Sequence, residues 1–96
     1  MLDIPLNLFI PNSFTPNGDG LNDSWIPLGY GFETLDYTIF DRWGNEVYQC
    51  NRPNCFEWNG SSHGTLLPTA TYSYLLIVKP INQREQQVRG QVTLVR

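Results

Sequence analysis

Apolar and polar residues alternate along much of the chain with a period of two, which is typical of β-strands. Leu6–Ile10 alternates before Pro11, and Leu35–Arg42 is rich in aromatic and β-branched residues. Trp43–Asn45 then provides turn residues, and Glu46–Gln49 has the composition of a returning strand. No segment of a dozen residues keeps a helical apolar pattern without a Pro or Gly interrupting it. The pattern predicts strands rather than helices.

The strongest alternation lies near the end of the sequence. Thr71–Val78 predicts a strand, Asn82–Glu85 predicts a polar turn, and Gln86–Arg96 predicts the strand that runs back. Gly90 is in phase with the apolar residues of the last strand, where a missing side chain indicates a bulge or close packing. Two sets of apolar residues would therefore face the core, namely Tyr72, Tyr74, Leu76 and Val78 on one strand and Val88, Val92 and Leu94 on the other.

Short strands separated by turn residues at this spacing predict a single antiparallel β-sandwich. Asn59–Thr69, between the two predicted hairpins, has the composition of a loop. The chain has 96 residues, of which 41% are apolar, so it can bury one modest core and is too short for two domains.

Charge and hydropathy narrow the function classes. The net charge is −3, and the five Arg and one Lys are scattered, so no basic run exists to neutralise nucleic-acid phosphates. The longest apolar run, Leu75–Val78, is far shorter than the ~20 residues of a membrane-spanning helix. Residues 1–5 have neither a basic start nor an apolar signal region. We therefore expect either a cytoplasmic protein or a domain of a longer exported chain.

The two cysteines bear on that choice. Cys50 and Cys55 lie in CNRPNC, where Pro and Asn favour a turn that can bring their Cα atoms within disulfide range. A disulfide there would indicate an oxidising compartment. Two free thiols are the alternative. A zinc pair is disfavoured, because only His63 could join it and a structural site needs four ligands.

A metal site is a second possibility, in the loop near the start of the chain. Asn17, Asp19 and Asp23, with the carbonyl of Leu21, place oxygen atoms at every second residue, a spacing that suits Ca²⁺. The EF-hand template fails, however, because aligning its glycine with Gly20 leaves uncharged residues at both ends of the template. The alternative is a series of turns in which Asn and Asp side chains bind backbone groups.

Catalytic machinery is not indicated. His63 is the one histidine, and it follows Ser62 directly in a loop-like stretch, which does not by itself make a supported triad. The sequence contains no nucleophile elbow, zinc-protease helix or glycine-rich phosphate loop. We expect no enzymatic activity.

Four stretches in a fixed order carry a family resemblance. They are PNSFTPNGDGLNDSW, IFDRWGNEVY, the Trp58–Gly60 triplet followed by TATYSYLL, and RGQVTLVR. Together they resemble the gliding motility-associated C-terminal domain, the type B C-terminal signal domain of the type IX secretion system. The resemblance covers residues 10 to 96. Two positions depart from the family, which usually has Asp at Asn59 and Gly at Ala70.

The resemblance implies an Ig-like antiparallel β-sandwich of about seven strands. It also implies that residues 1–96 form one C-terminal secretion-signal domain, excised from a larger exported protein. Such a domain is expected to fold in the periplasm and to direct its N-terminal cargo across the outer membrane to the cell surface or medium. Its expected partners are translocon or shuttle proteins of the outer membrane and a partner barrel protein, and we expect a monomer.

Two regions are candidates for partner recognition. Arg42 and Trp43 are residue types favoured in interfaces. The favoured alternative is that they serve the hairpin turn, with Arg42 stacking on an aromatic ring or pairing with Asp41 or Glu46. The last strand could be read by strand pairing at a sheet edge, although it could equally be a plain sandwich strand. Its candidate residues are Arg89, Gly90, Val92, Leu94 and Arg96.

A second function remains open on the residues alone. Exposed Trp25, Trp43 and Trp58 could form a sugar-stacking platform, which would make the domain an Ig-like adhesive or carbohydrate-binding module, with or without Ca²⁺. Aromatic residues of a small β-sandwich more often belong to the core.

Overall fold

The computed structural model describes residues 6–18, 20, 23–52, 55 and 57–96. The described residues form strands and no helices, so none of their elements is a helix that could cross a membrane. The strands are β1 (Asn7–Phe9), β2 (Ser13–Phe14), β3 (Leu28–Tyr30), β4 (Phe32–Phe40), β5 (Glu46–Asn51), β6 (Ser61–Ser62), β7 (Thr65–Leu66), β8 (Ala70–Pro80) and β9 (Gln86–Leu94).

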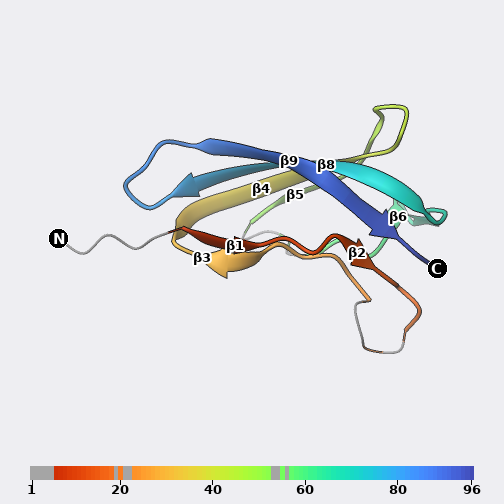
Figure 1. The fold of residues 1–96 in the computed structure, drawn as a ribbon. Helices are drawn as coiled ribbons and strands as arrows, with labels where there is room; N and C mark the ends of the chain where they lie inside the picture. The colour runs from red at the N-terminus through yellow and green to blue at the C-terminus, as the bar shows by residue number, and fades with distance from the viewer. Residues whose placement is uncertain (1–5, 19, 21–22, 53–54, 56) are drawn as a thin grey trace.

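The main layer is a five-stranded sheet in the order β2-β9-β8-β4-β5 (Figure 1). The two predicted hairpins supply four of its strands, and β4 pairs with β8 to join them. Both hairpins and the β4–β8 pair are antiparallel, whereas the short β2 pairs with β9 in parallel. The sheet is therefore mixed, with β2 covering only the last part of β9.

The second layer is smaller. It contains the β1–β3 ribbon, an antiparallel bridge between Trp25 and Trp58, and the β6–β7 hairpin. In Figure 1 the β1–β3 ribbon lies across from the long strands of the main sheet. The chain changes layer at Pro11, because β1 pairs with β3 whereas β2 pairs with β9.

The core fills the space between the layers. On β8 the predicted phase holds, since Tyr72, Leu76 and Val78 are buried and Tyr74 is half-buried. Trp25 and Trp58 are fully buried and donate their indole N–H groups to Pro11 O and Ser61 O, at 2.6 and 3.0 Å. The buried core residues are Phe14, Trp25, Leu35, Tyr37, Ile39, Cys50, Trp58, Tyr72, Leu76, Val78, Val92 and Leu94.

These observations confirm an all-β sandwich and correct its details. The described residues form nine strands where about seven were expected, and one of their strand pairs is parallel. Asn59–Thr69 is not simply a loop, because it contains the β6–β7 hairpin, whose turn places His63 at φ 51°. Such two-residue strands are too short to show a period of two, so the sequence pattern could not reveal them.

A disulfide joins Cys50 at the end of β5 to Cys55, with Cα atoms 5.6 Å apart. Arg52 lies inside the ring that this bond closes. Its backbone N–H donates to Leu35 O at 3.2 Å, and its guanidinium donates to Pro27 O. The disulfide therefore closes a loop that is also bonded to β4 and to the segment before β3.

Candidate recognition site at the turn end

The β4–β5 turn is held by one carboxylate. Asp41 Oδ1 accepts hydrogen bonds from the backbone N–H groups of Trp43 and Asn45, both at 2.9 Å. The Asn45 side chain donates to Asp41 Oδ2 at 3.3 Å. Hydrogen bonding, first of all from the Asn45 backbone, lowers the pKa of the Asp41 carboxyl, with a smaller contribution from the charge of Arg42. The backbone bonds from Asp41 N to Asn45 O and from Gly44 N to Asp41 O complete the turn. The side chains of Arg42 and Trp43 therefore take no part in closing it.

Arg42 and Trp43 form an exposed pair on this turn. The guanidinium carbon of Arg42 lies 4.8 Å from the centroid of the Trp43 ring, which is cation–π geometry. The Trp43 side chain is 74% exposed, the highest value among the large apolar residues described as exposed. Of the alternatives raised for Arg42, the structure shows stacking on an aromatic ring.

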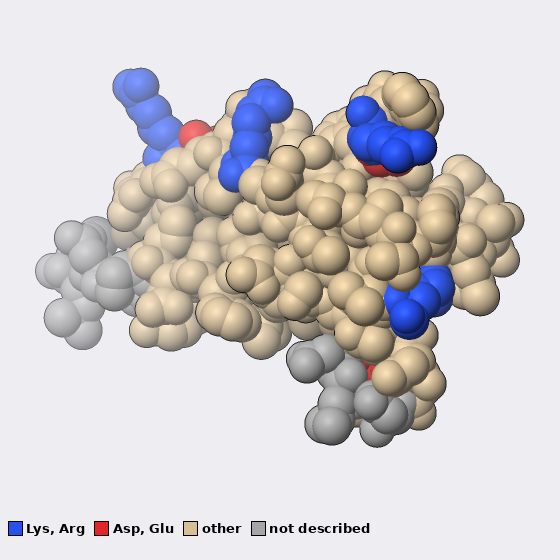
Figure 2. All heavy atoms as spheres, turned by 45° about the vertical axis from the view of Figure 1, so that its right-hand side comes forward, with Lys and Arg blue, Asp and Glu red and all other residues tan. Residues whose placement is uncertain are grey.

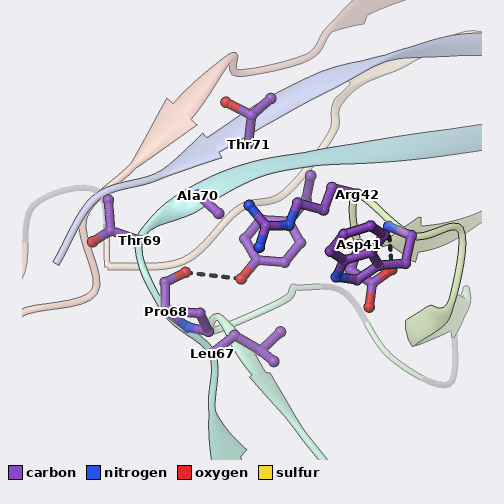
Figure 3. Close-up of a pocket in the computed structure, with 9 residues that line it drawn as sticks. Asp41, Arg42, Leu67, Pro68, Thr69, Ala70 and Thr71 are labelled. Carbon is purple, nitrogen blue, oxygen red and sulfur yellow. Dashed lines mark hydrogen bonds between the residues drawn. The ribbon is translucent and has the colours of Figure 1, made fainter.

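A hollow of about 380 Å³ lies beside the pair (Figure 3). Asp41, Arg42 and Trp43 form one side, and residues 67–72, leading into β8, form the other. Tyr72 Oη donates to Pro68 O at 2.8 Å, the bond dashed in Figure 3, which fixes the chain where it enters β8. We call Arg42, Trp43 and residues 67–72 the turn-end site.

Arg96 forms hydrogen bonds to the segment that makes up the second side of this site. Its backbone N–H donates to Thr69 Oγ1 at 2.9 Å, and its side chain donates to Leu67 O at 2.5 Å and to Gly60 O at 2.8 Å. A Cβ at Gly60 would lie 2.8 Å from Leu94 Cδ1 and 3.2 Å from Arg96 Nη2, so the glycine leaves room for both side chains. Burial raises the pKa of the Tyr72 hydroxyl, and the nearby Arg96 charge offsets part of that rise. Arg96 is exposed, but its side chain is bonded to the protein rather than simply facing water.

The other residues proposed on the last strand have different surroundings. Val92 and Leu94 are fully buried, so their side chains serve the core. Gly90 faces Tyr74 across the β8–β9 pair. Arg89 is exposed and lies on the opposite face of the sheet from the core.

The predicted metal loop is described only in part, since Asp19 and Leu21 lie outside the described residues. Asp23 Oδ1 accepts from the backbone N–H groups of Asn17 and Gly18, at 3.2 and 3.0 Å, and Asp23 Oδ2 accepts from Gly20 at 2.7 Å. The described residues contain no cluster of three His, Cys, Asp or Glu side chains that could hold a metal. Both oxygens of Asp23 are therefore engaged as in the turn alternative, in which the carboxylate binds the loop backbone.

The tryptophans do not form the platform considered above. Trp25 and Trp58 are fully buried, whereas Trp43 is exposed, so the three rings cannot stack on one ligand. In the described part of the chain, no hydrogen bond joins His63 to Ser62 or to a carboxylate. Neither observation favours sugar binding or catalysis.

Sequence reasoning singled out Arg42, Trp43 and Arg96 but not the wall formed by residues 67–72. That wall lies in and after the stretch expected to be a loop, and it approaches Trp43 only because β8 pairs with β4. Its one sequence signal was that residues 69–72 begin the TATYSYLL motif.

A comparison with known protein families covers most of the chain. The family model of the CHU_C type IX secretion signal domain matches residues 8–94, nearly the whole chain. No curated protein matches the chain. The matched range includes the Asp41 turn and residues 67–72, which line the hollow of the turn-end site. The chain belongs to the CHU_C family of type IX secretion signal domains.

Proposed function

We propose that this domain directs an N-terminal cargo through the type IX secretion system by docking its turn-end site on an outer-membrane translocon or shuttle component. One observation carries the proposal. Residues of three motifs that are far apart in the sequence meet at one end of the sandwich. Arg42 and Trp43 form an exposed pair beside a hollow, residues 69–72 line its other side, and Arg96 bonds to Leu67 and Thr69. Family membership supports the role of secretion signal, with export toward the cell surface or medium, and it indicates a signal rather than an enzyme.

The chemistry of the site suits protein recognition. Trp and Arg are the residue types that most often dominate binding energy in interfaces, each contributing about 2 kcal/mol or more when central. Asp41 fixes the turn before any partner arrives, so little ordering entropy is lost on binding. The wall formed by residues 67–72 supplies apolar surface beside Trp43.

Passage through the periplasm and docking on a partner barrel protein are part of the proposal. The Cys50–Cys55 disulfide supports it, because disulfides persist in oxidising compartments such as the periplasm. In this proposal the folded domain acts as a monomer, and Ca²⁺ is not required, since Asp23 binds loop amides directly.

Export of a fusion tests the proposal. The chain is fused behind a periplasm-directed fluorescent reporter in a bacterium that carries the secretion system, and reporter is measured in the medium and on the cell surface. Arg42→Ala combined with Trp43→Ala is expected to reduce export about tenfold or more, since it removes two anchor side chains without touching the core.

The matched control removes an equivalent pair elsewhere. Arg84→Ala combined with Tyr30→Ala deletes one arginine and one exposed aromatic ring, both away from the turn-end site. This control is expected to export like the parent. Circular dichroism of each purified chain verifies folding. Export of the Arg42/Trp43 variant at the level of the parent, or an equal loss of export in the control, would contradict the proposal.

Deleting residues 92–96 is a less informative test, because it removes buried Val92 and Leu94 and would unfold the domain.

A further inference from the structure

One edge of the main sheet is largely uncovered. β2 pairs with β9 only through Ser13 with Thr93 and Phe14 with Leu94. Before Pro11 the chain has left this sheet, because β1 pairs with β3 in the other layer. Among the described residues, β9 therefore has no neighbouring strand on its outer side from Gln86 to Gln91 (Figure 1).

The backbone groups along this edge can be assigned from the register. Thr93 N donates outward to Asn12 O at 2.9 Å, so Thr93 presents its N–H and C=O to the edge. The β8–β9 register is continuous from Gln86 to Leu94, and outward-facing groups recur at every second residue of an antiparallel strand. Gln87, Arg89 and Gln91 therefore present their N–H and C=O groups to the open edge. No described residue forms a hydrogen bond with those groups.

The side chains of the same three residues project from the outer face of the sheet, away from the core, and all three are exposed. Beside them a hollow of about 340 Å³ is lined in part by Phe40 and Leu75. We call the outward backbone and side chains of Gln87, Arg89 and Gln91 the β9 edge. It offers hydrogen-bonding backbone, one positive charge at its centre, and an adjacent partly apolar surface.

The charges in and around β9 indicate what kind of segment would pair with the β9 edge. The whole chain has a net charge of −3, yet from Trp58 onward it contains four basic residues and a single acid, Glu85. β9 itself contains Arg89 and no acid. In the view of Figure 2, Lys and Arg side chains protrude singly with little Asp or Glu surface between them. A strand added at this edge would place its residues directly beside Arg89, where opposite charge stabilises and like charge destabilises the pair.

We propose that the β9 edge binds an extended acidic segment of the outer-membrane partner, which adds as a strand beside Gln87, Arg89 and Gln91. This deepens the proposed function, on which it rests for the partner's location. A second copy of the chain fits less well, because two β9 edges that overlap fully in antiparallel pairing bring one Arg89 beside the other. Backbone pairing supplies affinity, and the acidic residue opposite Arg89 supplies selectivity.

Binding of defined peptides to the purified chain tests this inference. The probes are two fluorescein-labelled peptides of nine residues, one alternating Val with Glu and the other alternating Val with Lys, and the readout is fluorescence anisotropy. The acidic peptide is expected to bind about tenfold or more tightly than the basic one, with a preference that weakens as salt rises. Arg89→Glu is expected to reverse the preference.

A proline pair separates edge pairing from general charge attraction. Gln91→Pro removes an outward N–H at the β9 edge without removing a bond to β8, so it is expected to weaken acidic-peptide binding. Gln49→Pro is the matched control on β5, at the opposite edge of the sheet. Arg52 N donates to β4 through Leu35 O, so alternation directs Gln49 N outward. This control is expected to bind the peptide like the parent.

Several results would overturn the inference. These are no binding of the acidic peptide, an unchanged preference in Arg89→Glu, equal effects of the two prolines, or a concentration-dependent dimer in sedimentation that Gln91→Pro abolishes. The last result would assign the edge to a second copy. The reporter experiment is independent, because Arg42 and Trp43 do not belong to the β9 edge. If the Arg42/Trp43 variant loses export but the purified parent chain does not bind the acidic peptide, the proposed function stands and only the inference about the β9 edge is rejected.

Discussion

Gly90 and Tyr74 face each other directly across β8 and β9. A Cβ at Gly90 would lie 2.3 Å from Tyr74 Oη and 2.5 Å from Tyr74 Cζ, so the ring occupies the space that a side chain would need. The ring cannot easily move away, because its centroid lies 5.2 Å from the Trp25 ring in the core. The absence of a side chain at Gly90 is therefore a packing requirement, as the apolar phase of the strand predicts.

Gly90→Ala is accordingly expected to lower the free energy of unfolding by about 1–3 kcal/mol, because the added methyl group displaces the Tyr74 ring. Urea unfolding measures the change, and Gln91→Ala on the exposed face is the control. The same substitution in a Tyr74→Ala background should cost less, since the obstructing ring is gone. Equal stability of Gly90→Ala and the parent would show that the ring relocates freely.

At the scale of elements, the β4–β5 hairpin depends on the charge of Asp41. Its lowered pKa means that the folded state holds the carboxylate ionised more strongly than the unfolded chain does. The resulting stabilisation is fully present above the ordinary pKa of 3.8 and is lost as pH falls toward the lower folded value. This pH dependence of stability is a property of the turn, because the N–H groups that bind the carboxylate are those of Trp43 and Asn45.

Asp41→Asn should therefore be less stable than the parent at neutral pH, with a difference that shrinks as pH falls below about 4. Thermal melts between pH 2 and pH 7 measure this gap. The Glu46→Gln substitution, on the same hairpin, serves as control and is expected to follow the parent across the range. A gap that stays constant down to pH 2 would mean that ionisation of Asp41 does not support the turn.

The elements differ in how far the sequence predicts them. β8 and β9 have nine or more residues with clear alternation, so both strands and their core faces could be predicted. β2, β6 and β7 have two residues each and form only through pairing with distant or adjacent segments, which leaves no local pattern. The turn-end site shows the same division. Arg42 and Trp43 stand out by residue type, whereas Leu67 and Pro68 become part of the site only after β8 pairs with β4.

For the molecule as a whole, the disulfide matters because a domain of this size has a small margin of stability. Native domains are stable by only about 5–15 kcal/mol, and a short disulfide ring contributes about 2 kcal/mol of that. Cys50 belongs to the buried core, and Arg52 within the ring bonds to Pro27 O and Leu35 O, so the ring encloses a residue that is bonded to two other segments of the fold.

Reduction of the parent, or Cys50→Ala combined with Cys55→Ala, is expected to lower the free energy of unfolding by about 2 kcal/mol. Urea titrations with and without reductant measure it. The Ala double variant provides the control, since reductant should not change its midpoint. If the urea midpoint of the parent does not change when reductant is added, the disulfide ring contributes nothing to stability.

The parallel pairing of β2 with β9 has a mechanical consequence. β2 lies near the beginning of the chain and β9 near its end, and their pair is held through Thr93 N to Asn12 O and Val95 N to Phe14 O. Because the two strands run in the same direction, tension applied through the segments before β2 and after β9 slides them past each other. Both hydrogen bonds then bear the load together instead of opening one at a time. The short β2–β9 pair therefore resists tension in the direction in which a tethered cargo would pull on the chain.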